Sequence, residues 1–160
     1  MISLILNYLT LRQLTVKYEN SHKRLALSTF VKLLRATEVI SSTVHGPLTD
    51  LNLTISQFGV LEALYHLGTM CQRDLAKKIL KSTGNLTTVI DNLEKRKLVR
   101  RKRNENDRRY FDVSLTPKGE NLIKEIFPEH SDRIVKEMDY LTKSEQKQLG
   151  LLCKKLVNKA

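Results

Sequence analysis

Residues 82–115, STGNLTTVIDNLEKRKLVRRKRNENDRRYFDVSL, decide the fold, because they read as an amphipathic helix followed by a basic hairpin. The apolar residues of the first half recur at the i, i+3, i+4 and i+7 spacing that shares one helix face. They are Leu86, Val89, Ile90 and Leu93. The opposite face carries short hydrogen-bonding side chains, which can approach a base edge or a phosphate. The pattern therefore predicts a helix with one buried face and one face suited to nucleic acid.

The second half of the stretch is densely basic. Lys95 to Arg109 contains nine Lys or Arg against Glu105 and Asp107, a net charge of +7 out of +11 for the whole chain. Two β-prone pieces, Leu98–Arg103 and Tyr110–Leu115, flank a turn-forming Asn-Glu-Asn-Asp run. A polar-faced helix followed by a basic β-hairpin predicts a winged helix-turn-helix module that binds DNA.

Composition narrows the class of protein. A chain of 160 residues with 41% hydrophobic content can form one domain, or one domain with an oligomerisation extension. The net charge of +11 favours a polyanionic partner, with an ordinary basic protein as the alternative. The basic run lacks the interleaved apolar face of a membrane-surface helix, and neither an export signal nor a membrane span is predicted. Two cysteines make no disulfide framework, so we expect a reducing cytoplasm and no membrane partner.

The rest of the chain is predicted to form mainly helices. A long helix is predicted over 21–44, and Thr54 with Gln57 forms a capping box that begins a helix ending near Gly68. A short helix over 71–80 and a tight turn complete the helix-turn-helix, with an ordinary αα-hairpin as the alternative. After the second strand, whose apolar residues 111, 113 and 115 are expected to point inward, Thr116-Pro117 begins another helix. Pro128 is predicted to kink or interrupt that helix.

A second capping box over 142–145 begins the last helix. The apolar stripes of the outer helices exceed what a small winged domain needs for its own core, so a helical dimer interface is expected. The predicted fold class is mainly α with a small β-hairpin wing and flanking dimerisation helices. The expected domains are an N-terminal extension of uncertain structure (1–20), an N-terminal dimerisation helix with its connection (21–53), the winged helix-turn-helix domain (54–116) and C-terminal dimerisation helices (117–160).

Three segments together resemble the MarR (multiple antibiotic resistance regulator) family of bacterial transcription factors. They are LTISQFGVLEALYHLG, CQRDLAKKILKSTGNLTTVIDNLEKRKLVRR and NDRRYFDVSLTPKG, within a match over about residues 22–158. The most specific part is Asp107-Arg108-Arg109 followed by Leu115-Thr116, which is similar to the family's wing signature. One departure is Lys97, where the family more often has glycine, so that turn is expected to be strained or to use another conformation.

The resemblance implies a homodimer whose recognition helices, here residues 82–96, enter adjacent major grooves of double-stranded DNA while the wings reach minor grooves. Arg109 matches the wing arginine, and Asp107 matches the acid that orients the basic residues of the wing. The predicted DNA-binding residues come from the recognition helix and the hairpin. They are Ser82, Thr83, Asn85, Thr87, Thr88, Lys95, Arg101, Arg103, Arg108 and Arg109.

The expected function is that of a sequence-specific regulator, most simply a repressor of a palindromic operator, which the resemblance implies is released by a small phenolic or anionic effector or by oxidation. Cys71 precedes a predicted helix, a position that favours thiolate, and an unreactive cysteine is the alternative. The scattered histidines and the lack of phosphate loops or metal-ligand spacings predict no enzyme, no metal and no other cofactor. Nonspecific nucleic-acid or protein binding by a basic winged helix is the remaining alternative.

Overall fold

The computed structural model of the chain describes residues 21–105, 107 and 109–158. The chain divides into two units, Met1–Gly46 and Pro47–Ala160. In the first unit the described element is helix α2 (Ser21–His45), close to the predicted 21–44. Residues 1–20, predicted to be an extension of uncertain structure, lie outside the described residues.

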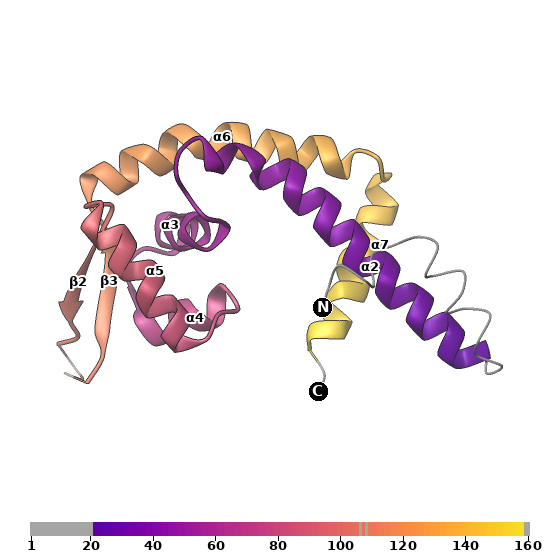
Figure 1. The fold of residues 1–160 in the computed structure, drawn as a ribbon, viewed down its shortest axis with the longest axis horizontal. Helices are drawn as coiled ribbons and strands as arrows, with labels where there is room; N and C mark the ends of the chain where they lie inside the picture. The colour runs from indigo at the N-terminus through magenta and orange to yellow at the C-terminus, as the bar shows by residue number, and fades with distance from the viewer. Residues whose placement is uncertain (1–20, 106, 108, 159–160) are drawn as a thin grey trace. The chain divides into compact units, whose positions relative to one another are not determined.

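The second unit is mainly helical, with a small antiparallel sheet (Figure 1). A 3-10 turn, η1 (Gly46–Thr49), leads into it from α2. Its elements, in chain order, are α3 (Ile55–Leu67), β1 (Met70–Cys71), α4 (Gln72–Lys78), α5 (Thr83–Lys95), β2 (Val99–Arg103), β3 (Phe111–Leu115), α6 (Pro117–Met138) and α7 (Lys143–Val157). This is the predicted fold class, a helical chain with a small β-wing.

Short-range signals in the sequence define the helix boundaries. The Thr54 hydroxyl accepts a hydrogen bond from Gln57 N at 3.2 Å, and the Gln57 side chain accepts one from Thr54 N at 3.0 Å. The predicted capping box is therefore present, and α3 ends at Gly68, whose φ of 75° favours glycine. The second predicted capping box is also present, between Thr142 and Glu145 at the start of α7.

The sheet has three strands in the order β1–β3–β2, so the predicted hairpin gains a short third strand. Strands β2 and β3 pair antiparallel with Val99 opposite Leu115 and Arg103 opposite Phe111. Strand β1 pairs with β3 through Met70 opposite Val113. Two residues are too few to show a periodicity, which explains why the sequence did not indicate β1.

The inward alternation predicted for β3 holds at Val113, which is fully buried, but is wrong at Phe111. The Phe111 side chain is 40% exposed. It lies at the end of the strand farthest from α6, where Arg103 places its guanidinium carbon 5.7 Å from the ring centroid. An alternating pattern shows which face a residue is on, but it does not show how far along the strand the core extends.

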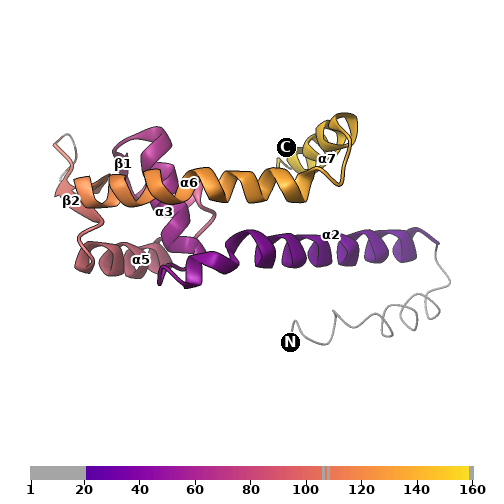
Figure 2. The same ribbon diagram turned by 90° about the horizontal axis from the view of Figure 1, so that it is seen from above.

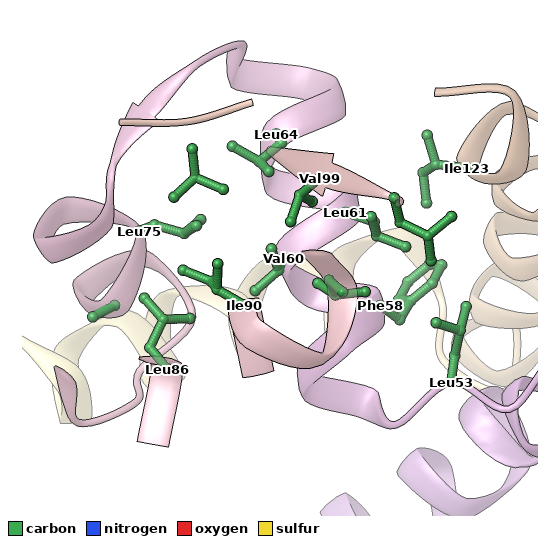
Figure 3. Packing of buried hydrophobic residues seen from close by; sticks show 14 of the residues in the cluster. Leu53, Phe58, Val60, Leu61, Leu64, Leu75, Leu86, Ile90, Val99 and Ile123 are labelled. Carbon is green, nitrogen blue, oxygen red and sulfur yellow. The ribbon is translucent and has the colours of Figure 1, made fainter. Parts of the chain in front are cut away.

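The core lies between α3, α5, the sheet and the first half of α6 (Figure 3). Phe58 and Leu61 from α3 and Leu86 and Ile90 from α5 belong to one buried cluster, in which Leu86 lies beside Leu75 of α4 on one side and Ile123 of α6 lies on the other. Each of these side chains is at most 1% exposed. The buried face predicted for the recognition helix therefore packs on the helix that precedes the helix-turn-helix pair.

The segment that follows the second wing strand contacts the turn that precedes the first wing strand. The Thr116 hydroxyl donates to Lys97 O at 2.6 Å and accepts from Gly119 N at 3.1 Å, which makes Thr116 the cap of α6. Gly119 lies so close to this turn that an added Cβ would meet Leu98 O at 2.0 Å. The Leu115-Thr116 pair of the wing signature therefore joins β3, α6 and the α5–β2 turn at one point.

The sequence predicts that Pro128 kinks or interrupts its helix, and an interruption is wrong, because α6 continues through it to Met138 (Figure 2). Proline removes one backbone donor, but Pro128 is exposed and Ser131 Oγ donates to its carbonyl at 2.7 Å. One missing hydrogen bond on a solvent-facing side does not outweigh packing along the rest of a 22-residue helix. No helix in the described part of the chain combines the length and the apolar character needed to cross a bilayer.

Candidate nucleic-acid interface

Helix α5 presents a polar face because its apolar face packs in the core, with Val89 partly buried at its edge. Leu86, Ile90 and Leu93 are 0% exposed. Ser82 caps the helix by accepting a hydrogen bond from Asn85 N at 3.3 Å, and α5 ends at the Arg96 cap, as the predicted range 82–96 requires. The exposed side of its first two turns consists of short polar residues and one glycine. They are Thr83, Gly84, Asn85 and Thr88.

Thr87 differs from its neighbours on α5. Its hydroxyl donates to Thr83 O at 3.1 Å and accepts from Gln72 Nε2 at 2.9 Å. The Gln72 contact links the first turn of α4 to α5 and so contributes to the angle between the two helices. The structure therefore places Thr87 between the helices of the pair, half-buried, while Asn85 and Thr88 are exposed.

Arg101 joins the wing to the recognition helix. Its guanidinium Nη2 lies 2.6 Å from Glu94 Oε2 and 2.7 Å from Asp91 Oδ1, and its backbone N donates to Glu94 Oε1 at 3.1 Å. The hydrogen bond to Glu94 raises the pKa of the Arg101 guanidinium. Both carboxylates belong to α5, so the Arg101 guanidinium is directed toward the recognition helix.

The wing tip holds an ion pair between Asp107 and Arg109. Arg109 Nη2 lies 2.7 Å from Asp107 Oδ2, its Nε lies 2.9 Å from Oδ1, and its backbone N also donates to Oδ1. The hydrogen bonds from Arg109 lower the pKa of the Asp107 carboxyl. The Arg109 side chain is 82% exposed, so the carboxylate orients a guanidinium that remains accessible. Arg108, also predicted to bind DNA, lies outside the described residues.

A cluster of Arg73, Tyr110 and Arg109 connects α4 to the wing tip, and sequence analysis missed it. Arg73 Cζ lies 4.8 Å from the centroid of the Tyr110 ring, and its Nη1 donates to the phenol oxygen at 3.2 Å. Arg109 Cζ lies 5.8 Å from the same centroid. Cation–π contact thus holds two arginines beside one ring. Residues 37 positions apart leave no local signal, so only the outward direction of Tyr110 could have suggested a partner.

The remaining predicted site residues lie at the edges of this surface. Lys95 is exposed in the last turn of α5, and Arg103 is exposed at the end of β2. Cys71 is half-buried at the β1–α4 junction, where it occupies the N-cap position without a side-chain capping bond and pairs with Asp112 in the sheet. The structure thus links Arg73 of α4 to the wing through Tyr110, links Arg101 of β2 to α5, and places Cys71 at the sheet.

Comparisons with known proteins agree with this geometry. The model of the MarR family matches residues 53–111. The HTH-type transcriptional regulator MhqR of Bacillus subtilis (strain 168) is 33% identical over 141 residues, which is 84% of this chain and 97% of that relative. The structure of Bordetella bronchiseptica BpsR, concerned with regulation of its DNA binding by 6-hydroxynicotinic acid, has a TM-score of 0.73 at 28% identity, over 80% of this chain and 91% of that one.

A second solved structure, NadR in complex with 4-hydroxyphenylacetate, has a TM-score of 0.70 at 28% identity and covers 81% of this chain and 92% of that one. The match to a full-length relative extends well beyond the winged module, and the expected wing signature stands at residues 107–116. The members of this family are DNA-binding regulators of transcription and not enzymes. The chain belongs to the MarR family of winged helix-turn-helix transcriptional regulators.

Proposed function

We propose that this protein is a cytoplasmic homodimeric repressor that binds a two-fold symmetric operator. Three observations carry the proposal: the exposed polar side chains in the first turns of α5, the exposed Arg109 paired with Asp107, and the Arg73–Tyr110 contact that joins α4 to the wing. A helix of this kind fits the major groove, and an exposed wing arginine fits the narrow, electronegative minor groove. Two copies related by a two-fold axis would read two half-sites about one helical turn apart.

The residues divide by role in this proposal. Asn85 and Thr88 are assigned to base edges or phosphates, because they are exposed on the outer face of α5. Thr83, Lys95 and Arg103 are assigned to phosphates. The remaining predicted residues position the surface: Ser82 caps α5, Thr87 bonds to Gln72, and Arg101 binds Asp91 and Glu94. Arg109, oriented by Asp107, is assigned to the minor groove, and Arg108 is assigned with it as a wing cation.

Release by a small hydroxylated aromatic acid is the second part of the proposal. It rests on BpsR and NadR, whose structures concern 6-hydroxynicotinic acid and 4-hydroxyphenylacetate. Oxidation of Cys71 remains a separate route to release, because the thiol lies at the β1–α4 junction beside the DNA-binding helices. Titrating the bound complex with these two acids, and separately with peroxide, distinguishes the routes.

The central experiment is selection of bound duplexes from a random pool, followed by footprinting. A symmetric footprint is the expected result. A steep salt dependence without sequence preference would instead support nonspecific coating of nucleic acid.

Arg109→Ala tests the wing assignment. Loss of one cation in the electronegative minor groove should weaken operator binding and reduce the slope of log K against log salt by about one. Stability should change little, because the side chain is exposed. Lys147→Ala, which removes an exposed lysine of α7, is the matched control and should leave binding unchanged. Equal operator affinity in Arg109→Ala and the wild type would show that the wing assignment is wrong.

A further inference from the structure

Leu80 has an unusual conformation for its residue type, in the turn between the two helices of the helix-turn-helix. Its φ is 54°, in the left-handed region that favours glycine. Lys81 N donates to Ala76 O at 3.0 Å and Leu80 N donates to Lys77 O at 3.3 Å. This pair of hydrogen bonds is a Schellman motif, in which the left-handed position is most often glycine. A leucine here is strained relative to glycine.

Within the described part of the chain, the side chain of Leu80 joins no apolar cluster that would offset this strain. It is 83% exposed and belongs neither to the buried core nor to the partly buried hydrophobics around it. Among the described residues, the other non-glycine positions with positive φ are Asn52 and Lys97. Asparagine tolerates this conformation and lysine has a polar end for solvent, so Leu80 is the apolar exception.

The position of Leu80 indicates what it can contact. It precedes Ser82, the N-cap of α5, by two residues, and the residues that follow it are exposed and polar or glycine. The preceding Ile79 packs against the core, whereas Leu80 does not. The exposed side chain of Leu80 therefore lies close in sequence to the exposed first turn of α5.

We propose that Leu80 is a specificity-determining residue that contacts the methyl group of a thymine in each half-site. This role of Leu80 rests on the proposed function. The N-terminal end of a recognition helix is the part that approaches base edges. In the major groove the apolar group on a base edge is the thymine C5-methyl, which alanine, threonine and phenylalanine side chains contact in known complexes. A strained, exposed leucine is explained if its side chain is buried only when DNA is bound.

The test removes single methyl groups from the DNA. Each thymine of the selected operator is replaced in turn by deoxyuridine, which lacks only the C5-methyl, and affinity is measured for the wild type and for Leu80→Gly. At one symmetric thymine position the wild type should lose about fourfold in affinity per methyl, the value of one buried methyl-sized group. Leu80→Gly should lose less than about twofold there, and it should remain folded because glycine relieves the strain.

Lys97→Gly is the matched control, because Lys97 occupies the same left-handed position at the end of α5. It should keep the deoxyuridine sensitivity of the wild type. The assignment is overturned if no thymine is sensitive, if Leu80→Gly is as sensitive as the wild type, or if Leu80→Gly changes self-association instead. Each of these results leaves a symmetric footprint intact, whereas failure of the proposed function would remove the footprint itself.

Discussion

Lys97 shows at the level of one residue how the turn before the wing is built. Its φ is 58°, and Lys97 N donates to Glu94 O at 2.8 Å while Leu98 N donates to Leu93 O at 2.9 Å. The α5 helix therefore ends in a Schellman motif with lysine at the position where the family more often has glycine. The strain expected from this departure is present as a left-handed backbone.

Lys97→Gly should stabilise the protein. The left-handed conformation costs a non-glycine residue about 1–2 kcal/mol, which glycine would avoid. Glycine also has more conformational freedom in the unfolded chain, and this reduces the gain in stability by about 0.5–1 kcal/mol. We expect a net gain of about 0.5–1 kcal/mol in the free energy of unfolding, measured by urea denaturation. Lys95→Gly, the same substitution at a helical position, should lose a similar amount. If both variants changed the free energy of unfolding in the same direction, this account of Lys97 would be contradicted.

Asp107 gives a pH prediction at the same scale. Its pKa is lowered by the hydrogen bonds from Arg109, so the ion pair is present above the ordinary pKa of an aspartate and is lost as pH falls through the lowered value. In Arg109→Ala the pKa of Asp107 should rise toward its ordinary value. Carboxyl chemical shifts followed by NMR through an acid titration measure this. An unchanged Asp107 titration would show that another group holds the carboxylate.

At the scale of elements, the wing depends on a few contacts between segments. Thr116 and Gly119 hold the start of α6 against the α5–β2 turn, and Arg101 holds β2 to α5. Helix α3, which supports α5, also packs against α6, which follows the wing. These helices therefore share one core. The position of the wing relative to the recognition helix is therefore set by packing and not by the hairpin alone.

Gly119→Ala should disrupt this junction. A Cβ would lie 2.0 Å from Leu98 O, a backbone atom that cannot move without shifting the turn or α6. We expect a loss of more than about 2 kcal/mol in the free energy of unfolding, in the range of overpacked cores. Gly150→Ala is the control, because an added Cβ there would meet no side chain or other segment of the described chain within 4 Å beyond its sequence neighbours, and alanine favours the helical conformation of α7. The midpoint temperature of thermal denaturation should fall for Gly119→Ala and rise for Gly150→Ala.

At the scale of the whole molecule, α7 presents apolar side chains to solvent. No residue of α7 is buried, and Leu149, Leu152 and Leu156 share a face at the spacing predicted from the sequence. Leu149 is 40% exposed, Leu152 is 54% exposed and Leu156 is 56% exposed. Exposed apolar stripes of this kind mark an interaction surface, and a second copy of the chain is the proposed occupant.

Leu152→Lys should weaken self-association. A charge placed in an apolar contact between helices would have to be desolvated, so we expect at least a tenfold rise in the dimer dissociation constant, measured by sedimentation equilibrium. Leu67→Lys is the matched control, because Leu67 is 53% exposed at the end of α3. Unchanged self-association in Leu152→Lys would place the dimer interface elsewhere. The same variant should also lose operator affinity, because two half-sites are bound together.

The sequence by itself determined the features that depend on contacts within about four residues. The capping hydrogen bonds of Thr54, Ser82, Thr116 and Thr142 are all of this kind, and each marks the start of a helix. The buried face of α5 also follows from periodicity, because a helix repeats its geometry regardless of what it packs against. The charge of the hairpin is a property of composition and is equally independent of the fold.

Only the tertiary structure decided which cations are accessible. Composition counts Arg101 and Arg109 equally, but Arg101 binds two carboxylates of α5 and Arg109 is 82% exposed beside one carboxylate. Arg73 joins the surface through Tyr110, and β1 joins the sheet through β3, across separations that carry no periodic signal. Ion pairs and strand pairing depend on where the chain returns in space, and that is set by packing of the core and not by the order of neighbouring residues.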